Sequence, residues 1–420
     1  MKKRIIAAFS AIVIILSLSS CNTKKIPFSF FDGNFSPFFV RGVQDLSVMA
    51  MTQESLLVKT EDEDGQTSPV FDAYSQGLGI ADIDIEYFDN RAVCTINLGQ
   101  DIYFSDGVQM TSKDVAFSMY VYAQADYDGW SILRSSPLDG LIAYRYGTDE
   151  AERLNFETAA LDAELANPSE RTKELIRSRI IYPVLRQEYY WVTHLYGDEA
   201  YIGTDVENHV KKYPDPRALF AYYYALDTDY DALSAADAQT VISDIAAQYD
   251  ADYKTLGIVY GNSLDSMARD CAKQALTEEK LKNSQTVGSV TSIRGIQIIN
   301  DFTLSVTINS IDPDDIENVL GIYVAPFHYY GQGCSFDGTG FKIDLDSVAQ
   351  KSSEPLGAGR FIMKKYTPGK GVSFKANKNY YRDISIEKSV YFYETGNSNI
   401  SIDNEYFTII DDRMLVKNNS

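Results

Sequence analysis

The residue types that most often carry out catalysis are sparse in this chain and poorly spaced for it. The only histidines are His194, His209 and His328, whose spacings of 15 and 119 residues do not fit a local zinc site. The sequence has no G-x-S-x-G nucleophile elbow and no P-loop, and Gly357-Ala358-Gly359 is explained by a turn. Carboxylates are abundant, so a pair of them does not by itself indicate glycoside hydrolysis. We therefore expect binding without catalysis, with no metal and no cofactor.

Cys21 points to a different chemistry, the attachment of lipid. Lys2, Lys3 and Arg4 precede an uncharged run of about 14 residues, which is typical of a secretory signal peptide and too short to span a bilayer comfortably. The tetrapeptide Leu18-Ser19-Ser20-Cys21 resembles the bacterial lipobox, whose cysteine receives diacylglycerol and becomes the mature N-terminus. The resemblance implies an exported protein, anchored through Cys21 to the outer face of a membrane. An ordinary signal peptide with a chance cysteine is the alternative.

Composition narrows the classes of partner. The formal charge of −21 argues against nucleic acid, whose phosphates would be repelled. Thirty Tyr against two Trp is unusual, and tyrosine can lie half-exposed at a contact surface. Beyond Cys21 only Cys94, Cys271 and Cys334 remain, so not all can pair internally. Cys94 shares an alternating face with Ala92 and Ile96, which favours a buried free thiol.

Two β-hairpins are predicted far apart in the sequence. Residues 83–98 alternate apolar and polar side chains around a turn at 88–91, and residues 296–308 do the same around Asn300-Asp301. Because each hairpin has one face to bury, we expect both to belong to one lobe. Further strands are expected at 372–376 and around 390–392. The class is mixed α and β.

Helical patterns occupy the remainder. Thr111-Ser112-Lys113-Asp114 is typical of a capping box at the start of a helix. Residues 43–57 have a helical period, and 218–226 and 235–249 are plausible helices within a tyrosine-rich, acidic region from 131 to 290. Packing of a helical layer explains Tyr222-Tyr223-Tyr224 better than a binding surface does.

These residues carry a resemblance to solute-binding protein family 5, the binding lipoproteins of oligopeptide, dipeptide and nickel ABC importers. The strongest match runs from the strand Val93–Leu98 through Phe104-Ser105-Asp106-Gly107 to Met110–Ser118. It is similar to the family pattern F-S-D-G-x-x-[LMV]-T-[AS]-x-D-V-x-[FY]-S. The resemblance implies a periplasmic-binding-protein-like type II fold, with the hairpins in its first lobe.

Weaker matches follow in the family's order. They are Asn34–Pro37 with Glu54–Leu57, Ala325–His328, Pro355–Phe361 and Asn377–Tyr381. Ala358 and Arg360 stand where the family has Thr and Pro, which puts the conformation of that loop in doubt. Family members also continue into a second α/β lobe, so the resemblance covers roughly residues 28–395 and implies a chain that lacks most of that lobe.

The expected organisation follows from these matches. Residues 1–20 are a lipoprotein signal peptide, 21–29 a tether, 30–130 the first part of lobe I with a hairpin and the capped helix, 131–290 a helical tyrosine-rich insertion, 291–395 the second part of lobe I, and 396–420 a truncated start of lobe II or a tail.

The resemblance also implies a function and a site. Family members bind an extended peptide between two lobes and deliver it to ABC transporter permease subunits in the membrane. The segment Arg41-Gly42-Val43 matches a family segment that contacts ligand backbone, and glycine allows close approach. A plain loop before a helix is the alternative. Tyr127 and Trp130 follow the capped helix in a loop that faces the cleft in the family, although an aromatic there could equally be core. Without the second lobe, weak peptide binding is expected. The alternative function is a transport-incompetent surface lipoprotein that acts as a partner-binding or sensor module.

Overall fold

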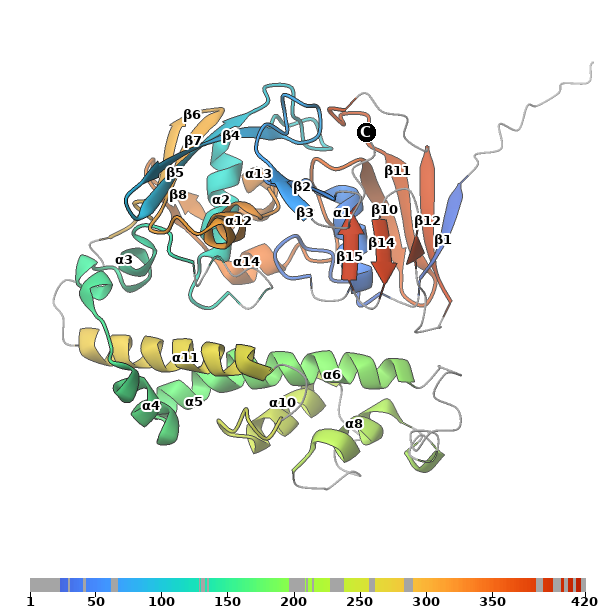
Figure 1. Cartoon of the computed structure of the whole chain (residues 1–420). Helices are drawn as coiled ribbons and strands as arrows, with labels where there is room; N and C mark the ends of the chain where they lie inside the picture. Colours follow the sequence, from blue (N-terminus) through green and yellow to red (C-terminus); the bar gives the residue numbers. More distant parts are fainter. Residues whose placement is uncertain are drawn as a thin grey trace, which may run out of the picture.

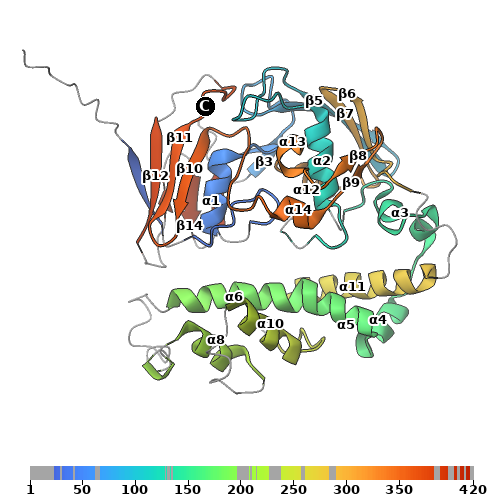
Figure 2. The same cartoon turned by 180° about the vertical axis from the view of Figure 1, so that it is seen from behind.

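The computed structural model places the chain in two layers (Figures 1 and 2). It describes residues 23–28, 31–40, 43–61, 67–127, 129, 133, 136–195, 208, 211–213, 215–226, 238–256, 261–282, 290–382, 388–395, 402–403, 407–410 and 413–416. Residues 1–20, expected to be a signal peptide, and Cys21 lie outside these residues. Two β-sheets and their helices form the upper layer, which we call the body. A helical layer of residues 158–281 lies beneath it.

The first sheet of the body joins the two predicted hairpins. Its order is β4 (Ala81–Phe88), β5 (Arg91–Leu98), β7 (Thr303–Ile308) and β6 (Ile296–Asn300). The two hairpins meet where β5 pairs antiparallel with β7, with Cys94 opposite Val306. The prediction that they share one lobe is therefore confirmed, as is the mixed α and β class. Cys94 is a fully buried free thiol, and burial raises its pKa to about 12.

Helices and short strands close the first sheet into the main core. They are α2 (Ser112–Tyr122), α3 (Leu141–Tyr146), α12 (Pro313–Leu320), α13 (Phe327–Tyr330) and α14 (Leu345–Ala349), with η2 (Asp149–Arg153) and the strand pairs β2 (Val58–Glu61) with β3 (Thr67–Val70) and β8 (Ser335–Phe336) with β9 (Phe341–Lys342). Fully buried Phe104, Phe117 and Ile96 all belong to this core. Burying apolar area on this scale is the main stabilising term of such a lobe.

The second sheet corrects one boundary of the sequence analysis. Its order is β1 (Lys24–Phe28), β12 (Ser389–Glu394), β11 (Gly371–Ala376) and β10 (Phe361–Thr367), and α1 (Val43–Thr52) covers one face. Residues 21–29 were expected to be a tether, but Lys24–Phe28 pairs parallel with β12. Ile26 and Phe28 are buried against Val390 and Phe392, so hydrophobic burial fixes this segment in the sheet. The expected strands at 372–376 and 390–392 are confirmed.

The helical layer has a core of its own. It comprises α4 (Thr158–Ala166), α5 (Glu170–Ile176), the π-helical turn η3 (Arg177–Ile181), α6 (Tyr182–Leu195), α8 (Pro216–Tyr224), α10 (Ala238–Gln248) and α11 (Gly261–Leu281). The layer is shorter than the expected insertion 131–290, because Leu133, Leu138 and Leu141 are buried in the main core of the body. Residues 402–416 of the C-terminal segment contain β13 (Ile402–Asp403), β14 (Phe407–Ile410) and β15 (Arg413–Val416) in a separate antiparallel sheet.

Candidate ligand-binding cleft

Asp114 connects two of the segments that resemble the solute-binding family. Its Oδ2 accepts the backbone N–H of Thr111 at 2.8 Å, which confirms the capping box at the start of α2. Its Oδ1 accepts the backbone N–H of Phe327 at 2.9 Å, so the same carboxylate holds residues 325–328 against the helix. Burial raises the pKa of Asp114, and these hydrogen bonds offset part of that shift. Asp114 therefore has a structural role.

The remaining matching segments meet at the same junction. His328 Nε2 lies 2.7 Å from Asp106 Oδ2. Asn379 Nδ2 donates to the carbonyl of Phe104 at 3.4 Å, and Ser105 donates its N–H to the carbonyl of Gly357 at 2.9 Å. Segments around residues 105, 328, 357 and 379 thus contact one another although they are far apart in sequence. These hydrogen bonds join segments of the same chain, which indicates that the matching motifs help to define the fold.

Close packing at this junction requires a glycine at position 359. Its N–H donates to the carbonyl of Thr52 at the end of α1 at 3.0 Å. A Cβ atom at position 359 would lie 2.5 Å from the Thr52 carbonyl carbon, closer than real Cβ contacts allow. The loop with Ala358 and Arg360 therefore stays tightly packed on α1, and Ala358 is fully buried. The two departures from the family pattern leave the loop firmly seated.

Arg360 lies beside a buried carboxylate. Glu54 faces Arg360 and Arg382, and the Tyr381 hydroxyl donates to Glu54 Oε2 at 3.3 Å. Burial raises the pKa of Glu54 to about 7, and the two guanidinium groups offset only part of the desolvation. Arginine at the position where the family has proline therefore places a cation beside Glu54.

Glu54→Gln is expected to flatten the pH dependence of stability. Since the pKa of Glu54 is raised to about 7 in the folded state, its contribution to stability is full below its unfolded pKa near 4.5 and is lost as the pH rises through 7. The loss amounts to about 3 kcal/mol at pH 8, at about 1.4 kcal/mol per pKa unit. Glutamine mimics the protonated acid, so the variant should gain stability over wild type as the pH rises. Urea denaturation from pH 5 to pH 8 measures this. Glu279→Gln, at an exposed position of α11, should keep the wild-type slope, and parallel slopes in all three proteins would contradict the prediction.

The structure corrects the expectation for Tyr127 and leaves the others untested. Tyr127 is 1% exposed, its hydroxyl donates to the carbonyl of Phe38 at 2.5 Å, and its ring packs against Phe39. Tyr127 is therefore a core residue, because the loop after α2 folds inward onto residues 38–39. Arg41, Gly42 and Trp130 lie outside the described residues, and Val43 is described only as the first backbone position of α1.

A cleft separates the body from the helical layer. Its volume is about 1190 Å³, and its lining includes Phe39, Gln124 and Phe341 from the body and Arg186 from α6. Polar and charged residues of the body also line it, namely Asn34, Asp126 and Asp344 from loops and Asp346 from α14. The volume exceeds the roughly 300–1,000 Å³ typical of small-molecule pockets. The cleft therefore has room for an extended ligand along the body, and Arg186 is the lining residue that the helical layer contributes among the described residues.

Two arginines position the loop after α2 at the edge of the cleft. Arg145 Nε donates to the carbonyl of Ala123 at 2.7 Å. Arg179 Nη2, from η3 of the helical layer, donates to the carbonyl of Ala125 and lies 3.8 Å from Asp126 Oδ1. Arg179 Nη1 donates to Gln274 Oε1 on α11 at 2.6 Å. The helical wall is thereby joined to the body by charge-assisted hydrogen bonds, which fix the width of the cleft.

Arg186 supplies positive charge to the helical wall. It faces Asp32 of the body, whose pKa is raised by burial and held down in part by the Arg186 charge. Among the described residues, no carboxylate lies within ion-pair distance of Arg186. Sequence reasoning missed Arg186 and Arg179 because it treated the helical region as packing. A signal was present, since three arginines fall within residues 177–186 of a strongly acidic chain.

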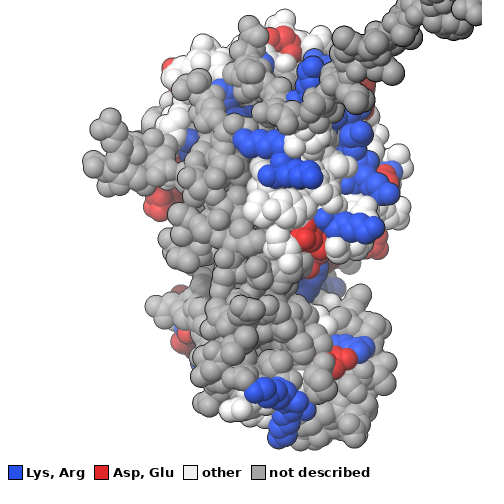
Figure 3. Space-filling model, turned by 90° about the vertical axis from the view of Figure 1, so that its right-hand side faces the viewer, with Lys and Arg blue, Asp and Glu red and all other residues white. Residues whose placement is uncertain are grey.

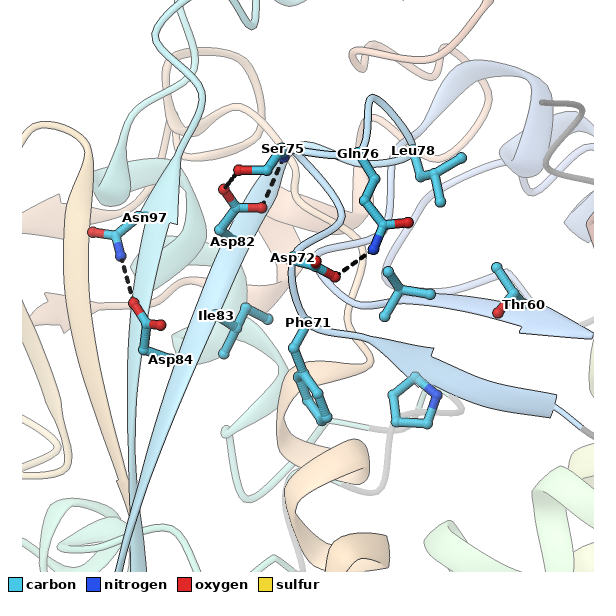
Figure 4. A pocket seen from close by; sticks show the side chains of 12 residues that line it. Thr60, Phe71, Asp72, Ser75, Gln76, Leu78, Asp82, Ile83, Asp84 and Asn97 are labelled. Carbon is cyan, nitrogen blue, oxygen red and sulfur yellow. Dashed lines mark hydrogen bonds between the residues drawn. The ribbon is translucent and has the colours of Figure 1, made fainter.

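A second hollow on the body is a weaker candidate. It has a volume of about 740 Å³ and is lined by residues of β2, β3, β4 and β5 and of the loop between β3 and β4 (Figure 4). Its acids already have donors: Asp82 accepts from the Ser75 N–H at 2.9 Å, and Asp72 accepts from Gln76 Nε2 at 2.6 Å. Across the described part of the chain, no group of three or more His, Cys, Asp or Glu side chains could hold a metal ion.

Comparison with known proteins gave no match to a family model and none to a curated protein. Solved structures do align with about nine-tenths of the chain. They include NikZ from Campylobacter jejuni in complex with Ni(L-His), at 11% identity and a TM-score of 0.37, with 89% of this chain and 39% of that chain covered. The oligopeptide-binding protein AppA from Bacillus subtilis, in complex with a nonapeptide, aligns at 10% identity and a TM-score of 0.40, with 89% and 40% covered. Lactococcal OppA with an endogenous peptide aligns at 12% identity and a TM-score of 0.43, with 89% and 42% covered.

The chain is similar to solute-binding proteins. It spans about two-fifths of the length of the solved structures reported above. The described helices include none that is both long enough and apolar enough to cross a bilayer.

Proposed function

We propose that this chain is the lipid-anchored, extracytoplasmic solute-binding component of an ABC importer, and that it binds an extended peptide without catalysis. The cleft between the body and the helical layer carries the proposal. Four sequence segments that resemble the importer-binding family meet at one junction of the body, which supports the assignment from the sequence side. Permease subunits in the membrane would be the partners that receive the peptide.

The second wall changes the affinity expected from the sequence. Weak binding was expected because a single lobe leaves a peptide open to water. The helical layer contributes Arg186 to the lining of the cleft, opposite the residues of the body. Two walls exclude more water from the ligand and strengthen charged contacts within the cleft. We therefore propose that the helical layer serves as the second wall.

The charge and shape of the residues that line the cleft suggest how it would recognise a peptide. Arg186 would bind a carboxylate of the peptide, as a guanidinium forms bidentate hydrogen bonds with this group. Tyr144, which is partly exposed, offers aromatic surface to side chains of varied shape. Arg41, Gly42, Val43 and Trp130 adjoin the cleft-lining loops in sequence, and we keep them in the proposed site as contacts to the ligand backbone and side chains.

Arg186→Gln is expected to weaken peptide binding about tenfold or more, because a hydrogen bond to a charged group contributes about 1.5–3 kcal/mol. Isothermal titration calorimetry of the full chain with a pool of synthetic tetrapeptides to octapeptides measures the effect. Arg269→Gln is the matched control, since Arg269 pairs with Asp162 on the helical layer and does not line the cleft. Equal binding by both variants, or no saturable binding by the wild type, would reject the proposed site.

A further inference from the structure

The distribution of charge singles out one part of this acidic chain. Residues 355–382 contain seven Lys or Arg and no Asp or Glu, although the chain average would place about four acids there. Figure 3 shows Lys and Arg side chains gathered on the body, on the side of the molecule that carries β1 and β12 in Figure 1. Such a basic area contrasts with the chain as a whole, whose formal net charge is −21.

Strand register brings these lysines to one face of the second sheet. Lys25 of β1 pairs with Tyr391, Tyr391 pairs with Ser373, and Ser373 pairs with Lys365 of β10. Paired residues project to the same side of a sheet, so this row lies opposite the buried face that holds Phe374 and Phe392. Lys375, two positions along β11 from Ser373, shares the row's face.

The lysines of this face are available for a partner. Lys25, Lys365 and Lys375 are all exposed, as are the neighbouring Lys364 and Lys370. Within the described residues, none of these five has an ion pair. Tyr393 lies on the same face and is 37% exposed, and tyrosine suits a boundary between water and lipid. We call this surface, formed by Lys25, Lys365, Lys375 and Tyr393, the basic sheet face.

The position of β1 sets how far the basic sheet face can be from a membrane. The strand begins at Lys24, three residues after Cys21. A chain of three residues spans at most about 10 Å. Because β1 is an edge strand of this sheet, lipid on Cys21 would hold the edge within about one Debye length of the headgroups at physiological salt.

We propose that the basic sheet face rests on the anionic lipid headgroups of the membrane that holds Cys21. This proposal rests on the lipid anchoring that is part of the proposed function. It adds to that function the orientation of the anchored protein on the membrane. Lysines near a negative membrane surface are attracted to it, and the acids elsewhere on the chain are screened by salt beyond about 8–10 Å. The remote acidic surface therefore does not cancel the local attraction.

Lysine footprinting of the anchored full chain tests the orientation, with the chain reconstituted into vesicles and exposed to a membrane-impermeant amine reagent. On vesicles with one third phosphatidylglycerol in phosphatidylcholine, labelling of Lys25, Lys365 and Lys375 should be about fivefold slower than on phosphatidylcholine alone. Lys254 and Lys282, exposed on the helical layer or just after it, should react equally fast on both. Half-molar salt should abolish the difference.

Paired variants keep the test sharp. Lys365→Glu combined with Lys375→Glu should remove the protection of Lys25, whereas Lys254→Glu combined with Lys282→Glu should leave it intact. Equal labelling rates of Lys25, Lys365 and Lys375 on the two vesicle types, whether all fast or all slow, overturn the proposal. A chain that neither vesicle retains overturns the anchoring and this surface together, while peptide capture is read separately by calorimetry.

Discussion

Replacing Cys21 with alanine is expected to move the protein out of the membrane fraction. Each buried methylene of an acyl chain contributes about 0.8 kcal/mol to membrane affinity, so two chains of diacylglycerol hold a protein stably. Alanine has no thiol to accept that lipid. Fractionation of cells, followed by immunoblotting, measures the change. We expect most of the variant to be soluble or to accumulate as unprocessed precursor.

Cys94→Ala is the matched control for this experiment. Cys94 is a buried thiol in the core of the body, and it should not affect localisation. Wild-type membrane retention of the Cys21→Ala variant, with wild-type processing, would contradict the lipid anchor. The assignment of the signal peptide could still stand in that case, because export does not require the lipid.

Asp114→Ala is expected to be the most damaging of the single substitutions considered for the body. The change leaves the partly buried N–H groups of Thr111 and Phe327 without their acceptor. A buried donor without a partner costs about 1–3 kcal/mol, and these two are partly buried, so we expect a loss of about 2–4 kcal/mol in the free energy of unfolding. Since small domains are stable by only about 5–15 kcal/mol, part of the variant should be unfolded at growth temperature.

Urea denaturation monitored by circular dichroism measures this loss. Asp114→Asn provides a graded comparison, because its single amide oxygen can serve one of the two donors. We expect its stability to fall between those of alanine and wild type. If alanine and asparagine cost less than about 1 kcal/mol each, the carboxylate would not hold α2 to residues 325–328 as its hydrogen bonds indicate.

The sequence was most informative where a local pattern of side chains was sufficient to define an element of structure. The alternation around Cys94 and Val306 was enough to predict both hairpins and their place in one lobe, because each had an apolar face to cover; their direct pairing in one sheet came from the structure. Thr111 and Asp114 likewise predicted the start of α2, since a capping box involves residues only three apart.

Long-range pairing and the orientation of single side chains could not be predicted in this way. β1 is a segment of five residues, two of them lysines, without a clear alternation of apolar and polar side chains. It becomes a strand only by pairing with β12, more than 360 residues later in the sequence. A tyrosine such as Tyr127 can lie at the surface or in the core, and its sequence neighbours do not distinguish the two. Tyr127 is buried because its loop turns inward onto Phe38. Arg186 acquires its place in the cleft only when the helical layer folds against the body.

The parallel pairing of β1 with β12 has a consequence for the order of folding. Ile26 and Phe28 are synthesised first, yet their partners Val390 and Phe392 come more than 360 residues later. The first sheet and the helical layer can form earlier, as their contacts close within residues 81–308. The second sheet must wait, and the entropy of closing so long a loop favours late docking of β1. The N-terminal strand of this chain is thus expected to be among the last elements to reach its native position.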